Sequence, residues 1–149
     1  PPSPYKSIDT LKIARKEFAF SSNKQDFLTK TFGLDEKLKT DFQLWVDCMN
    51  GNKDALNNML KYNKRDVVGL EQVYLKLRPY IKNHPNLGVL MDDSVCPTCG
   101  SKNLKPSDAT YFTSSNEFPV YRCGGCHSPF IRSKTGLGTN KTELRCVAR

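Results

Sequence analysis

The sequence has no apolar run that approaches the roughly 20 residues a membrane-spanning helix needs. It also lacks the apolar core of a signal peptide near its first residues, and it contains no internal repeat. These absences exclude a transmembrane helix and a repeat architecture, so we expect no membrane partner and a cytoplasmic location. The first residue is not methionine, which processing, trimming or a missing upstream part would each explain.

The composition is that of a soluble, globular and basic chain. Hydrophobic residues make up 38% and charged residues 26% of the 149 residues, and the formal net charge is +8. A basic balance favours polyanion partners, nucleic acid first, because phosphate contacts dominate affinity in that class. We expect nucleic acid as the partner, with DNA favoured over RNA. The alternative is a solvated surface with an excess of lysine.

Residue patterns divide the chain into a helical part and a β-rich part, which predicts an α+β protein. Helical patterns occupy most of residues 1–86, residues 87–95 form a short linker, and residues 96–149 lack helical signals. Strands are predicted at residues 109–114 and 118–122. A loop rich in Gly, Ser and Thr is predicted at residues 133–140.

The helical part contains predicted helix ends and apolar faces. Ser22 and Gln25 have the spacing of a capping box, and Gly33 is a predicted helix stop. A helix at residues 41–49, which Asn50-Gly51 should end, is expected to bury an apolar face made of Phe42, Trp45, Val46 and Met49. A short helix with Leu56, Met59 and Leu60 follows. The longest predicted helix has a stripe made of Val67, Leu70, Tyr74, Leu77 and Ile81, widened by Val73 and Tyr80, and Pro79 should kink or end it near Arg78.

Four of the six cysteines form two Cys-x-x-Cys pairs with 23 residues between them, at Cys96, Cys99, Cys123 and Cys126. Tetrahedral zinc needs four ligands from two places, and each pair sits in a tight turn that directs both sulfurs to one side. Gly100, Gly124 and Gly125 permit the positive φ angles that such turns use. The sequence therefore predicts a zinc ribbon at residues 96–149, in which bound metal contributes folding free energy.

Other uses of the cysteines are less consistent with the sequence. Disulfides would be expected with a signal peptide, and a thioredoxin-like redox pair with a βαβ pattern. His127 could replace a ligand but is expected to be only a neighbour of the site. Cys48 lies in an apolar helical stripe and is expected in the core, and Cys146 has no assigned role.

Basic and aromatic side chains are interleaved in the predicted ribbon. The candidate phosphate contacts are Arg122, Arg132, Lys134, Lys141 and Arg145, with Arg149 at the end of the chain. The aromatic residues near them are Tyr111, Phe112, Tyr121 and Phe130. Such a mixture is typical of phosphate contact combined with base stacking. The alternative is that the aromatic rings form the core of the ribbon, which we expect for two of the four.

A phenol and a carboxylate lie four residues apart at Tyr62 and Asp66. On one continuous helix both would project from the same face, toward the protein interior. A buried carboxylate is costly unless it is paired or holds a metal, and metal-dependent phosphodiester cleavage uses such groups. The alternative is a helix that begins at an Asn63 cap, with Asp66 in its first turn complementing the helix dipole.

Residues 62–66, Tyr-Asn-Lys-Arg-Asp, resemble the Tyr-x-x-x-Asp motif of the DEDD-type 3′–5′ exonucleases, which have a ribonuclease H-like fold. The sequence from Tyr62 to Asn86 is similar to a phage-associated branch of that superfamily, and so are residues 2–10, 22–28 and 42–48. A terminal zinc ribbon also occurs in that branch. The resemblance covers residues 1 to about 90 well. It implies that residues 1–86 are the helical, C-terminal portion of a ribonuclease H-like domain, and it places a phage-encoded protein in the host cytoplasm.

The resemblance also implies that Asp66 is the last of four acids that bind Mg²⁺ or Mn²⁺, and that Tyr62 positions the attacking water. The family's Asp-x-Glu pair is missing, since no Asp-x-Glu occurs in this sequence. We therefore expect the C-terminal portion of an exonuclease, inactive unless an upstream polypeptide supplies the other acids. The alternative function is a non-enzymatic adaptor that binds nucleic acid or docks proteins through its ribbon.

Overall fold

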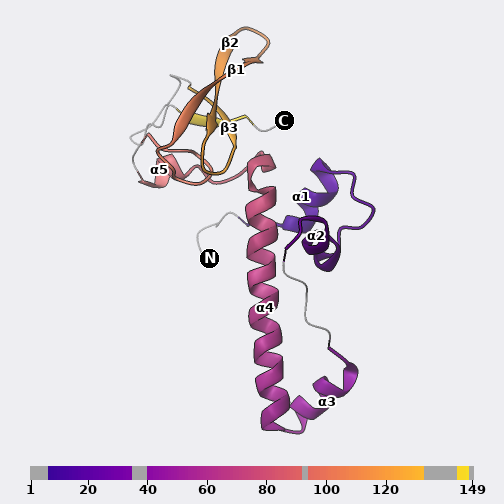
Figure 1. Cartoon of the computed structure of the whole chain (residues 1–149). Coiled ribbons are helices and arrows are strands. Elements are labelled where there is room, and N and C mark those ends of the chain that lie inside the picture. Colours follow the sequence, from indigo (N-terminus) through magenta and orange to yellow (C-terminus); the bar gives the residue numbers. More distant parts are fainter. Residues whose placement is uncertain (1–6, 35–39, 92–93, 133–143, 148–149) are drawn as a thin grey trace, which may run out of the picture. The chain divides into compact units, whose positions relative to one another are not determined.

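The computed structural model describes residues 7–34, 40–91, 94–132 and 144–147 (Figure 1). It contains both helices and an antiparallel sheet, which confirms the mixed α+β class. Contacts divide the chain into two units, a helical one at Thr10–Lys76 and a second one that contains Leu77 and the residues after it. Among the described residues, no helix is both long enough and apolar enough to span a membrane.

Four helices make up the helical unit: α1 (Thr10–Glu17), α2 (Gln25–Thr31), α3 (Phe42–Met49) and α4 (Lys53–Leu77), the last of which ends at the boundary. The short and the long helix expected after residue 52 are one continuous helix of 25 residues. Asn52 starts it, because its Oδ1 accepts hydrogen bonds from the backbone N–H groups of Asp54 and Ala55. Pro79 ends it as predicted, and a 3₁₀ turn follows at Arg78–Tyr80.

Glycines end α2 and α3, as the sequence predicts. Gly33 and Gly51 both have positive φ, 64° and 77°, and each follows the C-cap residue of its helix. The N–H groups after each helix bond back to its last carbonyls; Gly33 donates to Lys30 and Leu34 to Thr29. This is the Schellman arrangement, which satisfies the last carbonyls and which a residue with a Cβ enters only with strain.

The capping box expected at Ser22 and Gln25 is absent from the described part of α2. The N-cap residue is Lys24, whose side chain makes no cap hydrogen bond. Ser22 Oγ instead accepts from the N–H of Lys24, at 3.4 Å. Gln25 points across to α4, where its Nε2 donates to the carbonyl oxygen of Asp66 at 3.0 Å. The prediction was wrong because the Gln25 side chain, which a capping box needs, makes a tertiary hydrogen bond to α4 instead.

The side of α4 that is turned inward matches the predicted stripe only toward the end of the helix, where Val73 and Leu77 are buried. Gly69 and Val73 are buried, and Tyr62 and Asp66 are half-buried. Val67 is 68% and Leu70 45% exposed, although both belong to the predicted stripe. The inward side instead follows three- and four-residue steps through Ala55, Met59, Tyr62, Asp66, Gly69 and Val73. The sequence analysis did not predict this inward side, because the side contains a glycine and an aspartate and the analysis followed only large apolar residues.

Helix α3 forms within one residue of its predicted position, but the expectation that it buries its apolar face is wrong. Asp41 caps it, since its Oδ1 accepts from the N–H of Leu44 at 2.9 Å. Phe42 is 81%, Trp45 52% and Met49 88% exposed, and only Val46 of the predicted face is half-buried. An amphipathic pattern indicates that one face of a helix is suited to burial. Whether that face is buried depends on a second surface that packs against it.

The second unit contains α5 (Leu87–Met91) and four strands, β1 (Leu104–Phe112), β2 (Glu117–Cys123), β3 (Pro129–Arg132) and β4 (Leu144–Cys146). All neighbours are antiparallel, in the order β1-β2-β3-β4. The sequence predicts the first two strands but not β3 or β4, which have only four and three residues. The loop predicted at residues 133–140 lies outside the described residues.

Part of the predicted linker is built into the second unit. Residues 87–91 are helical, Gly88 is buried, and the N–H of Leu87 donates to the carbonyl of Pro97 at 2.8 Å. Val95 is fully buried. The core of this unit surrounds the cysteines and contains Cys96, Cys123, Cys126, Phe130 and Leu144. A hydrophobic core this small needs a further source of stability, which a metal can provide.

Candidate metal centre

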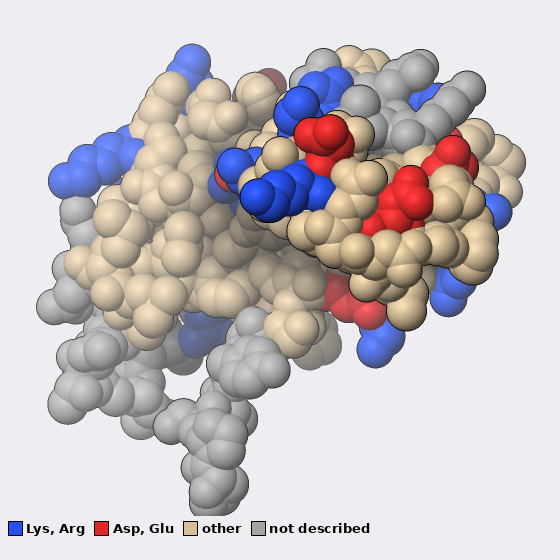
Figure 2. Space-filling view, turned by 90° about the horizontal axis from the view of Figure 1, so that it is seen from below, with Lys and Arg blue, Asp and Glu red and all other residues tan. Residues whose placement is uncertain are grey.

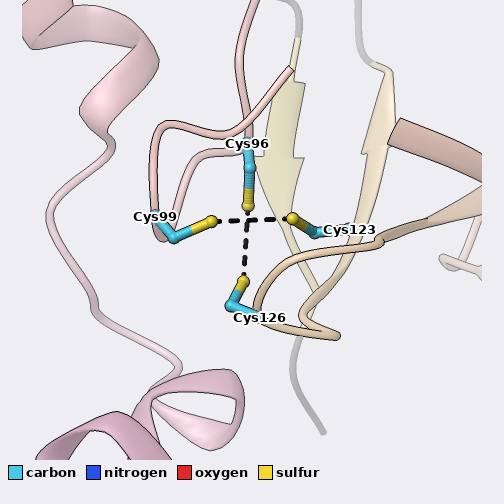
Figure 3. Close-up of side chains that lie close together, drawn as sticks. All are labelled: Cys96, Cys99, Cys123 and Cys126. Atoms are coloured by element: carbon cyan, nitrogen blue, oxygen red, sulfur yellow. Dashed lines mark hydrogen bonds between the residues drawn. The ribbon is translucent and has the colours of Figure 1, made fainter. Parts of the chain in front are cut away.

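The sulfurs of Cys96, Cys99, Cys123 and Cys126 converge on one point, all within 4.8 Å of one another (Figure 3). Cys96 Sγ lies 3.6 Å from Cys126 Sγ, and Cys99 Sγ lies 3.5 Å from Cys123 Sγ. Zinc–sulfur bonds of about 2.3 Å in a tetrahedron place sulfurs about 3.8 Å apart. The four thiols therefore fit a tetrahedral metal ion such as zinc, in composition and in spacing.

Two turns of the same design hold the sulfurs. In the first turn, Gly100 N–H donates to the carbonyl of Cys96 at 2.9 Å, and Cys96 N–H donates to the carbonyl of Ser101. In the second turn, His127 N–H donates to the carbonyl of Cys123 at 2.9 Å, and Cys123 N–H donates to the carbonyl of Ser128. Each turn thus joins its first cysteine to the residues four and five positions later, which fixes both sulfurs on one side.

The expected role of the glycines is confirmed in one turn and replaced in the other. Gly100 has φ 73°, as a positive-φ position requires. In the second turn that position is taken by His127, with φ 61°, and neither Gly124 nor Gly125 has positive φ. Gly124 serves close approach instead, since a Cβ there would lie 2.4 Å from Asn103 Nδ2. Its N–H donates to the carbonyl of Asn103 at 2.8 Å.

The thiols are shielded from water and hydrogen-bonded by their surroundings. Cys96, Cys123 and Cys126 are buried, and Cys99 is half-buried. The N–H of Gly125 donates to Cys123 Sγ at 3.3 Å, and Cys126 Sγ lies 3.2 Å from the buried Oγ of Ser128. Hydrogen bonds to sulfur stabilise a thiolate, which is the form that binds metal.

The thiols titrate unequally. The hydrogen bond with Cys96, aided by Ser128, lowers the pKa of Cys126 to about 4. The same hydrogen bond, with burial, raises the pKa of Cys96. Burial is the main cause that raises the pKa of Cys99. The pKa shifts of Cys96 and Cys126 therefore have opposite directions, and Cys126 is the thiol that its surroundings favour as a thiolate.

The two other cysteines lie apart from the sulfur cluster. Cys48 lies in α3 and is half-buried, so the prediction that it lies in the core is only partly confirmed. Cys146 is half-buried in β4, where its sulfur accepts a long hydrogen bond from the Thr98 hydroxyl at 3.9 Å. His127 is exposed and adjoins the cluster, as expected.

The predicted nucleic-acid contacts divide between two faces of the sheet. The strand register pairs Ile131 with Arg145 and Arg122 with Pro129, and this alternation puts Arg122 and Arg145 on one face. Arg132 belongs to the opposite face, where its guanidinium lies 5.7 Å from the centre of the Tyr121 ring. All three arginines are exposed. Lys134, Lys141 and Arg149 lie outside the described residues.

The aromatic residues of the ribbon have mixed roles. Phe130 is buried, and Tyr121 stacks on it with ring centres 5.8 Å apart. These two rings form part of the core, as the alternative to base stacking predicts for two of the four. Phe112 is 56% exposed near the end of β1, and Tyr111 is half-buried.

Tyr62 and Asp66 lie on one continuous helix. Because α4 begins at Lys53, Asp66 is far from the first turn, and the alternative of an Asn63 cap is wrong. Both side chains are half-buried, on the inward side of the helix. Among the described residues, the four cysteines form the only group of three or more potential metal ligands, so the acids that would complete a catalytic site around Asp66 are not found there.

Comparisons with protein-family models, with curated proteins and with solved structures found no match to this chain.

Proposed function

We propose that Cys96, Cys99, Cys123 and Cys126 bind one structural zinc ion and that the second unit is a zinc ribbon. The spacing of the four sulfurs is the observation that carries this proposal. Two matching turns present the thiols without rearrangement, and all four ligand positions are filled by protein. Closed four-thiolate sites are structural rather than catalytic, because no position is left for water or substrate. Zinc would supply stability that the small core around Phe130 and Leu144 lacks.

Metal analysis tests the proposal directly. The reduced protein, purified without chelator, should contain one zinc per chain, and Co²⁺ substitution should give the absorption of a tetrahedral thiolate site. A chain that remains folded in its second unit and contains no metal would contradict a structural zinc.

We further propose that the chain is the nucleic-acid-binding C-terminal portion of a metal-dependent 3′–5′ exonuclease. The resemblance of residues 62–86 to the Tyr-x-x-x-Asp region of that superfamily is the starting point. The place of Tyr62 and Asp66 supports it, since both lie four residues apart on the half-buried side of one helix.

Exposed apolar residues next to this helix side support the need for an upstream polypeptide. Leu56 is 47%, Leu60 52% and Val67 68% exposed along α4, in addition to Phe42, Trp45 and Met49 of α3. Scattered exposed apolar residues are ordinary, whereas Leu56, Leu60 and Val67 share one stripe of α4, at spacings of four and seven residues, and such a stripe is typical of a surface that another polypeptide covers. A polypeptide bearing the missing Asp-x-Glu pair would cover it and complete the acids around Asp66.

The charge distribution supports nucleic acid as a partner of the ribbon more than of the helical end. Figure 2, which looks at the molecule from below, shows acidic and basic side chains interspersed among other residues on the nearest surface. On the ribbon, Arg122 and Arg145 share one sheet face, and β2 and β4 carry no acidic side chain except Glu117 at the start of β2. Phosphate contacts from that face would give binding that weakens with salt.

Reconstitution separates this proposal from its alternative, a non-enzymatic adaptor. The chain should show no nuclease activity alone with Mn²⁺ and should gain 3′–5′ exonuclease activity when an upstream fragment with Asp-x-Glu is added or fused. Failure of every such fragment that binds the chain would favour the adaptor. Absent or salt-insensitive binding of single- and double-stranded DNA would instead favour a ribbon that docks protein.

A further inference from the structure

The hairpin of β1 and β2 extends beyond the third strand of the sheet (Figure 1). β3 pairs only with residues 120–122 of β2, whereas β1 and β2 stay paired as far as Phe112 and Glu117. Thr113 closes the end of the hairpin, because its N–H and its hydroxyl both donate to the carbonyl of Asn116, at 2.9 and 3.1 Å. The second unit therefore has a two-stranded projection that is hydrogen-bonded up to its tip.

Two cations lie directly opposite each other at the base of this hairpin. Lys105 of β1 pairs with Arg122 of β2, and both residues are exposed. The Cβ atoms of such a pair are about 5 Å apart, and like charges there repel each other. Neither side chain forms an ion pair within the described part of the chain. An anion between them would relieve the repulsion, and both side chains are suited to phosphate.

A hydrogen bond joins Arg122 to the second cysteine turn. Its Nη1 donates to the carbonyl of His127 at 3.4 Å, and the N–H of His127 donates to the carbonyl of Cys123. A guanidinium has five N–H donors, so this bond leaves donors for a phosphate. The turn that presents two of the sulfurs thus also positions a cation of the hairpin.

An aromatic pair lies on the same face of the hairpin, nearer its tip. Tyr111 pairs with Phe118, and both residues are half-buried. Phe118, Val120 and Arg122 alternate along β2, so the aromatic pair and the cation pair belong to one face. Four residues of strand, about 13 Å, separate the two pairs. Val120 lies between them and is buried, so a ligand would contact the pairs at the two ends of this face.

Neither acid of the hairpin lies opposite one of the two cations. Glu117 pairs with Phe112 on the other face, and Asp108 lies in the irregular stretch of β1 between Pro106 and Thr110. The face therefore suits an anion that also carries flat rings, which is a description of a polynucleotide. Protein rings stack on bases that are unpaired, because the bases of a duplex already stack on one another.

We propose that this face binds single-stranded nucleic acid, with a backbone phosphate between Lys105 and Arg122 and an unpaired base against Tyr111 and Phe118. This inference rests on the nucleic-acid binding proposed above for the ribbon, and it specifies the class of substrate and the contacts. A duplex reaches the cations but offers no base to the rings, so its affinity is lower.

Fluorescence anisotropy of the zinc-loaded full chain tests the inference, with a labelled oligothymidylate and a duplex of equal length. The single strand should bind at least tenfold more tightly at the same salt concentration. Equal or tighter binding of the duplex would overturn the inference and leave the proposed nucleic-acid function intact. Absence of salt-dependent binding to either probe would contradict that function as well.

A charge reversal tests the phosphate contact. Lys105→Glu puts opposite charges across from each other, so it should keep or raise the midpoint of thermal unfolding while it weakens oligothymidylate binding at least tenfold. Lys53→Glu is the matched control, because it makes the same charge change at an exposed position at the start of α4. Equal losses in the two variants would mean a general charge effect and would refute the site.

Ring substitutions test the base contact. Tyr111→Leu should weaken oligothymidylate binding at least fivefold without changing its salt slope, whereas Lys105→Ala should reduce that slope by about 1. Phe112→Leu is the control, because this exposed ring belongs to the other face of the hairpin. Far-ultraviolet circular dichroism and zinc content check that each variant is folded. An effect of Phe112→Leu as large as that of Tyr111→Leu would overturn the placement of the base.

Discussion

Gly100 and His127 occupy equivalent positions in the two cysteine turns, both with positive φ, 73° and 61°, and both with the N–H donated to the carbonyl of the first cysteine at 2.9 Å. The left-handed region costs a residue with a Cβ about 1–2 kcal/mol relative to glycine, although histidine enters it more often than most. The second turn therefore contains strain that the first does not.

The first prediction concerns this pair. Gly100→Ala should weaken zinc binding roughly tenfold, because the Cβ adds strain and would lie 3.1 Å from Met91 Sδ. His127→Gly should keep or improve zinc binding, since the exposed imidazole loses no packing. Competition with a chromophoric chelator measures both. A loss of affinity in His127→Gly as large as that in Gly100→Ala would show that the imidazole, not the backbone, matters at this position.

The second prediction concerns protons. Because the hydrogen bond with Cys96 lowers the pKa of Cys126 to about 4, this thiol is already ionised at pH 7, and zinc should release fewer than four protons per site. Cys96 and Cys99, whose pKa values are raised, still hold protons that zinc must displace. Zinc affinity should therefore rise with pH and fall as the solution is acidified.

Calorimetry in buffers of different ionisation enthalpy counts the protons released. Cys126→Ser serves as the comparison, because it removes the ligand whose pKa is lowered and keeps Cys99, whose pKa burial raises. Release of four protons at pH 7 by the unchanged chain would contradict the low pKa of Cys126.

Sequence reasoning succeeded where the constraint is local. The cluster of four cysteines follows from spacing alone, and the ends of α2 and α3 follow from glycines that a Schellman turn requires. Pro79 marks the end of α4 because it cannot continue the helix. The helix ends are decided within about five residues, and the cysteine cluster depends on two such short motifs, so the sequence alone contains these causes.

The failures concern what surrounds an element. The apolar face of α3 predicts burial, yet Phe42 and Met49 are more than 80% exposed, because burial depends on a second surface. Gln25 does not cap α2 as predicted, because its side chain donates a hydrogen bond to the carbonyl of Asp66, 41 residues away. Strands as short as β4 contain too few residues to show an alternation. A short stretch of sequence does not show which distant residues it will contact.

The third prediction separates the two units. Cys99→Ser should abolish stable zinc binding and unfold the second unit, because a structural site with three thiolates loses most of its folding free energy. The helical signal in circular dichroism should fall little, since Thr10–Lys76 forms its own unit. Cys146→Ser is the matched control, as Cys146 lies in the same unit outside the sulfur cluster. An equal loss of helix in Cys99→Ser would mean that the units fold together.

The fourth prediction locates the proposed nucleic-acid contacts. Replacing Arg122 and Arg145 with Ala should weaken DNA binding and reduce the slope of log K against log salt by about 2, one for each phosphate contact. Arg132→Ala should have less effect, because Arg132 lies over Tyr121 on the opposite sheet face. Fluorescence anisotropy at several salt concentrations measures the slopes. A larger change in Arg132→Ala would assign the contact to the face of Tyr121 instead.

The fifth prediction concerns Asp66 and requires the reconstituted enzyme. Asp66→Asn should lower exonuclease activity at least a hundredfold, because an amide is a neutral and poorer ligand for a divalent metal than a carboxylate. Tyr62→Phe should lower it less, as it removes one hydroxyl and keeps the ring on the half-buried side of α4. Asp54→Asn is the control, because Asp54 is an exposed acid in the first turn of the same helix. Full activity of both Asp66→Asn and Asp54→Asn would contradict a catalytic role of Asp66. Asp66 would then have a structural role through its backbone carbonyl, which accepts a hydrogen bond from Gln25.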